Sequence, residues 1–313
     1  MFDDVLKRIE EWDTITIYPH SSPDGDALGS CFGLKELLVN KYPNKKIYVV
    51  GTDCSLNQVF FPSFDVVSDE EIKQSLAISL DTANTARVYD QRYTLAPYLI
   101  KIDHHPNLEP FGDICIVEDQ MGATCELVTM LGQELYQEEP FPALAARYLY
   151  AGIMTDTMGF TTSSTNAHSL QMAAYLSQFG VDHNEISYLL TAKEVPMFRF
   201  ISKLREIAVF EEGFLYIVVP ASLYQEYGIS YADARNQVSN FAGIKGIKVW
   251  CLFTESDGSD NVRYSCSLRS RGIIINDVAR DFHGGGHDVA AGAKILSDEE
   301  LPAILEALRK KVR

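Results

Sequence analysis

The sequence has no excess of basic residues. Its 27 lysines and arginines stand against 43 aspartates and glutamates, which gives a formal net charge of −16 at pH 7. Proteins that hold long nucleic acid by its phosphates carry a basic face, so this composition argues against a partner such as long duplex nucleic acid. Small anionic substrates remain compatible with it if bound metal supplies the positive charge.

Long apolar runs are also missing. The longest, FLYIVVPA at 214–221, is far shorter than the roughly 20 residues that cross a bilayer. The first residues, MFDDVLKRIEEW, are charged and contain no apolar core of the kind found in a signal peptide. We therefore expect a cytoplasmic protein without a membrane partner.

Paired cysteines are absent as well. The six cysteines are scattered, most of them in apolar segments, and no two form a CxxC motif. This spacing indicates neither a disulfide framework nor a zinc knuckle. The sequence also shows no internal repeat and no low-complexity tract.

Length and patterning predict two α/β domains. The 313 residues, 46% of them hydrophobic, exceed what one core usually fills. In the first half, short apolar runs rich in Ile, Val and Tyr alternate with helix-length segments, which is typical of βαβ units and a mainly parallel sheet. We predict a catalytic domain over 1–185, a linker over 186–200, where Pro196 interrupts the pattern, and a smaller α/β domain over 201–313.

Acidic residues and histidines recur where the predicted strands end. They follow TITIYP, LAISL and YLIKI, and a further aspartate closes the apolar run YLYAGIMT. In open parallel sheets, ligands bind beyond the carboxyl ends of the strands, so four separate segments are expected to converge. A single aspartate at such a position is usually a cap or turn residue. The residues concerned are His20, Asp24, Asp26, Asp81, Asp103, His104, His105 and Asp156.

Such a cluster predicts a metal site. Crowded carboxylates repel one another and resist ionisation unless a cation compensates them. Oxygen ligands with a few imidazoles suit Mn²⁺ or Mg²⁺ better than zinc, which prefers thiolate and histidine. The number of side chains fits two divalent ions better than one.

Five motifs in this order resemble those of a known family. HSSPDGDA, SLDTAN, DHH and GIMTDT look like the four motifs of the DHH phosphoesterase superfamily, and SLRSRG with GGGHDVAAG resembles its DHHA1 substrate-binding domain. The length and layout look closest to the NrnA-like subgroup of small bacterial nano-RNases. The resemblance implies a hydrolase that cleaves very short RNA to 5′-mononucleotides and removes the 3′-phosphate of 3′-phosphoadenosine 5′-phosphate (pAp).

The resemblance also implies residue roles. One metal ion would be held by His20, Asp24 and Asp81, and the second by a group that shares the bridging Asp81, namely Asp26, Asp81, His104 and Asp156. His105 would contact the scissile phosphate rather than a metal; the alternative is that it only hydrogen-bonds a carboxylate beside the ligands. Catalysis would therefore depend on Asp81, His104, His105 and Asp156, with Mn²⁺ as the expected cofactor and Mg²⁺ as the alternative.

The C-terminal domain is expected to hold the substrate. A run of glycines brings backbone N–H groups close to an anion or simply forms a turn, and HGGGH at 283–287 fits both interpretations. The resemblance favours recognition of the nucleotide away from the scissile bond. It assigns this role to Arg269, Ser270, Gly285, Gly286 and His287, together with His105 at the phosphate.

The sequence leaves the preferred substrate open. A phosphodiesterase acting on c-di-AMP or pApA would use the same two domains, so short RNA, pAp and cyclic or linear dinucleotides all remain candidates. Met158 stands where the subgroup more often has glycine, which affects substrate preference rather than the ligands.

A non-catalytic nucleotide sensor would need a degraded cluster, and every predicted ligand is present. Monomer and homodimer are both compatible with the sequence.

Overall fold

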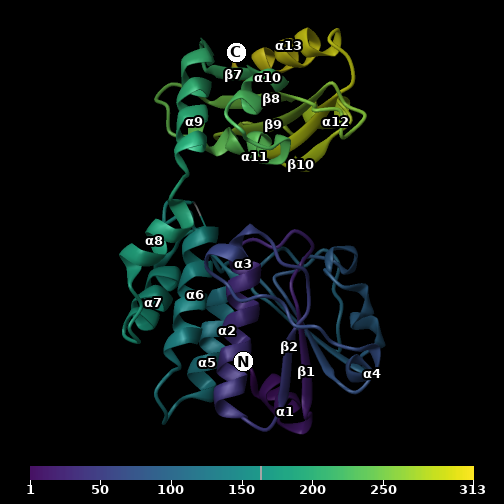
Figure 1. Ribbon diagram of the computed structural model, residues 1–313, viewed down its shortest axis with the longest axis vertical. Coiled ribbons are helices and arrows are strands. Elements are labelled where there is room, and N and C mark those ends of the chain that lie inside the picture. The colour runs from purple at the N-terminus through teal and green to yellow at the C-terminus, as the bar shows by residue number, and fades with distance from the viewer. Residues whose placement is uncertain (163) are drawn as a thin grey trace. The chain divides into compact units, whose positions relative to one another are not determined.

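The computed structural model describes residues 1–162 and 164–313, and its contacts divide the chain into two compact units, Met1–Ala192 and Lys193–Arg313 (Figure 1). Both are α/β, as predicted. Within the described residues, no helix is both long enough and apolar enough to cross a membrane.

The first unit is built on a five-stranded sheet in which every neighbouring pair is parallel. The strand order is β2-β1-β3-β4-β5. The central strand β3 is buried at every position, as expected for a parallel strand with both faces covered. The strands are β1 (Thr14–Tyr18), β2 (Lys46–Val49), β3 (Leu76–Leu80), β4 (Tyr98–Asp103) and β5 (Ile114–Val117).

Helices cover this sheet, and the longest, α2, is almost completely buried along its N-terminal half. In Figure 1 it lies with α5 and α6 beside the sheet. The helical segments are α1 (Asp3–Glu11), α2 (Gly25–Lys41), α3 (Ser55–Val59), α4 (Asp69–Ile72), η1 (Thr85–Arg87), η2 (Gln91–Leu95), α5 (Thr124–Leu135), α6 (Ala143–Asp156), α7 (Ala167–Ser177) and α8 (His183–Thr191).

Glycines let α2 and α6 approach each other closely. A Cβ atom on Gly29 would lie 2.7 Å from the carbonyl oxygen of Tyr148, and one on Gly152 would lie 3.1 Å from the carbonyl oxygen of Gly25. No side chain fits at these two positions, so backbone packs against backbone. The two helices run in opposite directions, and the start of α2 therefore meets the end of α6.

The second unit has a six-stranded sheet of order β10-β11-β9-β8-β7-β6. Only β7 and β8 are parallel neighbours; the other pairs are antiparallel. The strands are β6 (Val209–Glu211), β7 (Phe214–Val219), β8 (Val249–Glu255), β9 (Tyr264–Ser270), β10 (Gly285–His287) and β11 (Ala290–Ile295).

Each face of the second sheet has its own apolar cluster. One cluster includes Val278 and Leu308, from helices on one face, and the other includes Phe200 and Ala234, from helices on the other. The helical segments are α9 (Val195–Ile207), α10 (Ala221–Glu226), α11 (Tyr231–Arg235), η3 (Asn236–Phe241), α12 (Asn276–Asp281) and α13 (Glu300–Val312). The segment 186–200, predicted as a linker, consists mostly of the end of α8 and the start of α9.

Candidate metal centre

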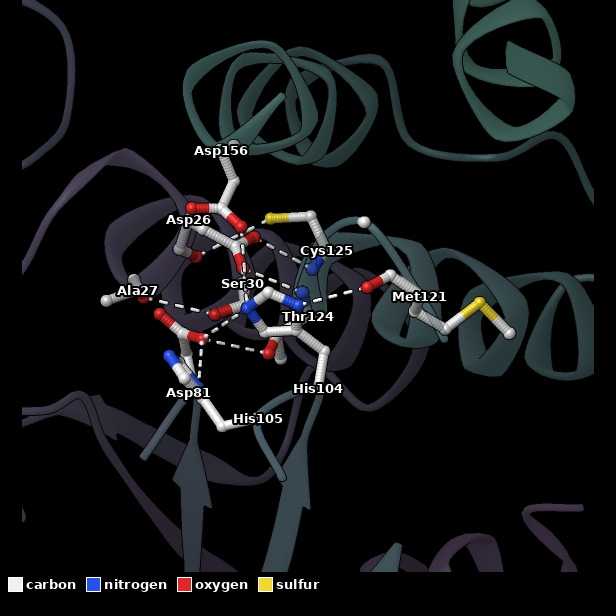
Figure 2. A network of polar contacts seen from close by, with 12 residues as sticks. Asp26, Ala27, Ser30, Asp81, His104, His105, Met121, Thr124, Cys125 and Asp156 are labelled. Carbon is white, nitrogen blue, oxygen red and sulfur yellow. Dashed lines mark hydrogen bonds and ion pairs between the residues drawn. The ribbon is translucent and has the colours of Figure 1, made fainter. Parts of the chain in front are cut away.

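The predicted ligands gather at the carboxyl edge of the first sheet. His20 follows β1, Asp81 directly follows β3, and Asp103 is the last residue of β4, with His104 next in the chain. The start of α2 adds Asp24 and Asp26, and the last residue of α6 adds Asp156. Figure 2 shows the carboxylates of Asp26, Asp81 and Asp156 around the imidazole of His104.

The DGD turn divides its two carboxylates between different tasks. Asp24 is the N-cap of α2, and its Oδ1 accepts hydrogen bonds from the backbone N–H groups of Asp26 and Ala27, both at 3.1 Å. Its Oδ2 lies 3.7 Å from Nε2 of His20. Gly25 between them has no room for a side chain, because a Cβ would lie 2.3 Å from Oγ1 of Thr155.

Asp26 faces the start of another helix. Its Oδ2 and Oδ1 accept hydrogen bonds from the backbone N–H groups of Thr124 and Cys125, at 2.7 and 2.9 Å. These are N–H groups that α5 itself leaves unpaired, and Ala123 at its N-cap has no side chain to accept them. The carboxylate is therefore held rigidly, with lone pairs still available to a cation.

Asp81 is shared between two groups of ligands. Its Oδ2 lies 3.5 Å from Nε2 of His20, and its Oδ1 lies 3.5 Å from Nε2 of His104. The hydroxyl of Thr124 donates to Oδ1 at 3.0 Å. The backbone of Asp81 has a φ of 54°, a conformation that costs a non-glycine residue energy and that often marks functional positions.

Three groups of side chains within the described residues could each hold a cation. His104 Nε2 lies 3.4 Å from Asp156 Oδ2 and 3.9 Å from Asp26 Oδ2. Neighbouring ligands of one six-coordinate ion are about 3 Å apart, so these spacings are close to those of a filled site. The groups are His20, Asp24 and Asp81; Asp26, His104 and Asp156; and Asp81, His104 and His105.

Both predicted histidine ligands are oriented by backbone carbonyls. Nδ1 of His20 lies 2.9 Å from the carbonyl oxygen of Ser21, and Nδ1 of His104 lies 3.2 Å from that of Met121. A carbonyl oxygen only accepts, so each Nδ1 carries the hydrogen. In the neutral imidazole, Nε2 is then the nitrogen with a lone pair, and it points into the carboxylate cluster, as metal-binding histidines do.

Without a bound cation, protons compensate the carboxylates of the cluster. Burial, together with the neighbouring Asp81 and Asp156, raises the pKa of Asp26 well above its usual value. Burial and nearby carboxylates likewise raise the pKa of Asp156 to about 6. Burial opposes a charge on His20, but Asp24 and Asp81 outweigh it and raise its pKa to about 10. Divalent cations would satisfy the same carboxylates, so the residues fit two such ions.

Thiolate ligands are not part of this site. Cys31 and Cys125 are buried close to it, but burial and the carboxylates of Asp26 and Asp81 raise both thiol pKa values well above normal. The thiol of Cys125 donates to the carbonyl oxygen of Asp26 instead. Carboxylates and imidazoles therefore make up the candidate ligand groups among the described residues.

His105 is held differently from His104. Its Nδ1 lies 2.8 Å from Oδ1 of Asp103, which accepts the hydrogen, and 3.5 Å from Oδ1 of Asp81. This hydrogen bond, opposed by burial and aided by Asp81, raises the pKa of the His105 imidazole. With Nδ1 occupied, Nε2 is the atom available to a substrate.

Sequence reasoning missed several residues around the cluster. Thr124 and Cys125 belong to a fifth converging segment, the start of α5. Arg87 is exposed, and its Nη2 lies 3.3 Å from Nδ1 of His20. Nδ1 of His20 already donates its hydrogen to the carbonyl oxygen of Ser21. The Arg87 guanidinium is therefore free to turn toward a bound anion. A basic residue three positions after DTAN was the available signal.

The second unit presents several of the other predicted residues on one sheet face. Arg269 and His287 both pair with Ala290, from opposite sides, and Gly285 pairs with Gly292 in the next row. Residues directly opposite in antiparallel strands project from the same face, so Arg269, Gly285 and His287 share it.

Gly286 and Ser270 occupy the alternate positions and project from the other face. The Ser270 hydroxyl donates to the carbonyl oxygen of Ile273 at 2.5 Å, so it is already engaged.

A basic cavity lies on the shared face. It measures about 260 Å³, and its lining includes His283 of the HGGGH segment together with Arg235, Ser267 and Lys294, three residues that were not predicted to bind substrate. Arg269 stands in the neighbouring row, where burial lowers the pKa of its guanidinium without removing its charge at neutral pH. Side chains alternate between the two faces of a sheet along each strand. If β11 had been recognised as a strand, this alternation would have placed Ser267 and Lys294 on the same face as Arg269.

Similarity to known proteins agrees with this geometry. Residues 14–153 match the DHH family, N-terminal domain, and residues 212–313 match the DHHA1 domain. The chain belongs to the DHH family of phosphoesterases, whose members are metal-dependent.

Among its relatives, the bifunctional oligoribonuclease and PAP phosphatase NrnA of Bacillus subtilis is 34% identical over 98% of this chain and 97% of its own length. A probable NrnA of the same description from Streptococcus mutans is 33% identical over 100% of this chain and 99% of its own. A solved exopolyphosphatase-related protein from Bacteroides fragilis has a TM-score of 0.88 at 26% identity, covering 99% of this chain and 95% of that one.

Proposed function

We propose that this protein is a metal-dependent phosphoesterase that hydrolyses very short RNA to 5′-mononucleotides and removes the 3′-phosphate of pAp. The observation that carries the proposal is the sharing of Asp81, whose two carboxylate oxygens face different histidines, each beside further carboxylates. The relatives described as oligoribonuclease and PAP phosphatase, similar over their full lengths, support the choice of substrate.

In this proposal the N-terminal domain, residues 1–185, holds two ions. His20, Asp24 and Asp81 would hold one, and Asp26, Asp81, His104 and Asp156 the other, with Mn²⁺ expected and Mg²⁺ as the alternative. When bound, a pair of divalent ions supplies an activated water and stabilises the charge that develops on the phosphate oxygens. The protein fixes the ligands beforehand through the Thr124, Ser21 and Met121 contacts.

His105 and Arg87 would meet the substrate beside the ions. The Nδ1 hydrogen of His105 is bound to Asp103, and the hydrogen bond to Asp103 raises the pKa of the ring, so a protonated Nε2 would donate to a nonbridging oxygen of the scissile phosphate. The exposed guanidinium of Arg87 offers donors to a second phosphate group. Two such groups fit a substrate such as pAp, which carries a phosphate at each end of its ribose.

Residues 201–313 would form the domain that binds the rest of the substrate. Arg269, Gly285 and His287 share one face with the basic cavity, and the resemblance adds Ser270 and Gly286 through their backbone. The whole chain is nevertheless acidic, with a formal net charge of −16. Short substrates are therefore favoured over long strands, whose affinity would depend on many phosphate contacts.

Product analysis on a substrate panel tests the proposal. The purified protein with Mn²⁺ is incubated with RNAs from dinucleotides to about 24-mers, with pAp, with c-di-AMP and with pApA. We expect mononucleotides from the shortest RNAs and AMP from pAp, and no product in the presence of chelator. Turnover confined to c-di-AMP and pApA would replace the proposal with a cyclic-dinucleotide phosphodiesterase, and no turnover of any substrate would contradict it.

A further inference from the structure

A buried lysine lies behind the candidate metal centre. Lys101 of β4 is fully buried, and its Nζ lies 3.2 Å from Oδ2 of Asp103 and 3.2 Å from the carbonyl oxygen of Ala83. The ammonium also stands over the ring of Phe111, 4.7 Å from its centroid. Lysine is almost never fully buried without a partner, so these contacts indicate a specific task.

Asp103 is the charge partner of this lysine. It is also fully buried, and its two oxygens have different neighbours. Oδ1 accepts from Nδ1 of His105 at 2.8 Å and from the His105 backbone N–H at 3.2 Å. No well-directed hydrogen bond from the described part of the chain reaches Oδ2, so the Lys101 ammonium is its compensation.

The sequence spacing produces this chain of contacts. Lys101 and Asp103 are two positions apart on one strand and therefore project from the same face of the sheet. His105 lies just beyond the strand end, where Asp103 can reach its ring. Ala83 lies two residues after Asp81, so the same ammonium also touches the segment that follows the shared ligand of the neighbouring strand.

We propose that Lys101 is a positioning residue that acts through Asp103 on His105. The ammonium holds the Asp103 carboxylate in one orientation, so that its Oδ1 accepts the Nδ1 hydrogen of His105 and Nε2 is turned toward the substrate. The proposal rests on the proposed function, in which His105 contacts the scissile phosphate. Lys101 itself touches neither substrate nor any predicted metal ligand.

Lys101→Met tests the role, because methionine keeps an unbranched apolar stem and removes the charge. Loss of a group that orients an active-site side chain typically lowers activity about 10- to 100-fold. We expect that loss in kcat, with KM and the bound metal content unchanged. Lys203→Met is the matched control, since Lys203 is a surface lysine paired with Glu206, and it should behave as wild type.

A double-mutant cycle separates positioning from general damage. If Lys101 acts only through His105, adding Lys101→Met to His105→Ala should cause no further loss of kcat. Full additivity of the two losses would overturn the proposal. Loss of metal or a raised KM in the single variant would also overturn it, because the effect would then reach beyond His105.

A second variant and a second measurement cover a failure to fold. Asp103→Asn keeps the shape and removes the charge that Lys101 compensates, so it should reproduce the loss of kcat if the single lysine variant is unstable. Nitrogen NMR of the His105 ring, at a pH where it is neutral, should show hydrogen on Nδ1 in the wild type and a mixture of tautomers in either variant.

The NMR result does not depend on turnover, so it decides the positioning role even if the proposed function fails. Unchanged tautomers in both variants would overturn the role. Altered tautomers in a protein that turns over none of the substrates would uphold the role and contradict the proposed function.

Discussion

The two units hold their candidate functional residues in opposite ways. In the first, Asp26, Asp81 and Asp103 are 1%, 2% and 0% exposed, and backbone or side-chain groups fix each carboxylate. In the second, His287 and Lys294 are exposed on a sheet face beside an open cavity. The first arrangement suits chemistry that needs fixed geometry, and the second suits a substrate whose length and base vary.

The largest effect should come from the shared carboxylate. Asp81→Asn preserves shape but removes the charge that both ligand groups use, so we expect activity to fall about 10³-fold or more on every substrate. Steady-state kinetics on a dinucleotide and on pAp measures it, with Asp3→Asn on the surface of α1 as the control. If Asp81→Asn retained more than a few per cent of wild-type activity, the rigidly held carboxylate of the first unit would not be required for the chemistry, and the contrast between the units would be wrong.

Metal removal should affect the stability of one unit only. An ion present at about 100 times its Kd adds about 2.7 kcal/mol to the free energy of unfolding of the unit that binds it. Chelation should therefore speed hydrogen exchange in β3 and leave β8 unchanged, as measured by mass spectrometry on the full chain. Equal acceleration in β8 would show that the metal supports both units.

Arg269→Ala should change substrate binding more than chemistry. A hydrogen bond from a charged group contributes about 1.5–3 kcal/mol, so KM for short RNA should rise about tenfold or more while kcat changes little. Arg280→Ala is the matched control, because Arg280 is an exposed arginine of α12 in the same unit. A fall in kcat with unchanged KM would assign Arg269 to the chemistry instead.

The same variant tests the preference for short substrates. In the wild type, kcat/KM should be highest on the shortest RNAs and depend weakly on salt, because few phosphates are contacted. Arg269→Ala should lower kcat/KM most for the shortest RNAs. If kcat/KM instead rose with RNA length and depended strongly on salt, the exposed sheet face of the second unit would contact many phosphates, which contradicts this interpretation.

The smallest effect should be a gain in stability. Met158 has a φ of 47°, a left-handed conformation that costs a side chain about 1–2 kcal/mol. Glycine relieves that cost but loses more entropy on folding, so Met158→Gly should raise the free energy of unfolding by less than about 1 kcal/mol. Thermal unfolding measures it, and Met158→Ala, which keeps a side chain, should show no gain. A destabilised glycine variant would mean that the methionine side chain supports the fold.

The parallel sheet and the convergence at its edge could be predicted because parallel strands all end at one edge. Apolar runs marked β1, β3 and β4, and polar residues at their ends marked the site. By contrast, β11 was missed because Ala, Gly and Lys are poor strand formers, and its pairing with β9 stabilises it. The start of α9 was read as a break because Pro196 interrupts helices, yet it lies in the first turn, where proline is favoured.

The residues that surround the predicted ligands could not be identified from the sequence. Lys101 looks like any charged residue in a strand, and only its burial beside Asp103 distinguishes it. Arg87 and Thr124 come from segments whose position relative to His20 and Asp81 depends on the folded sheet. Pattern and spacing place residues along an edge, whereas contacts across that edge depend on packing.

The close approach of α2 and α6 has a consequence for mutational tolerance. Asp26 and Asp156 sit at adjoining ends of these helices, so the separation of the two carboxylates is set where Gly29 and Gly152 let the backbones touch. A single methyl group at Gly29 would act as a spacer between the two helix backbones, and one at Gly152 would also press on Cys125 and lie 3.2 Å from Oδ1 of Asp26. A random screen for inactive variants should therefore recover substitutions at these two chemically inert positions nearly as often as at the aspartates.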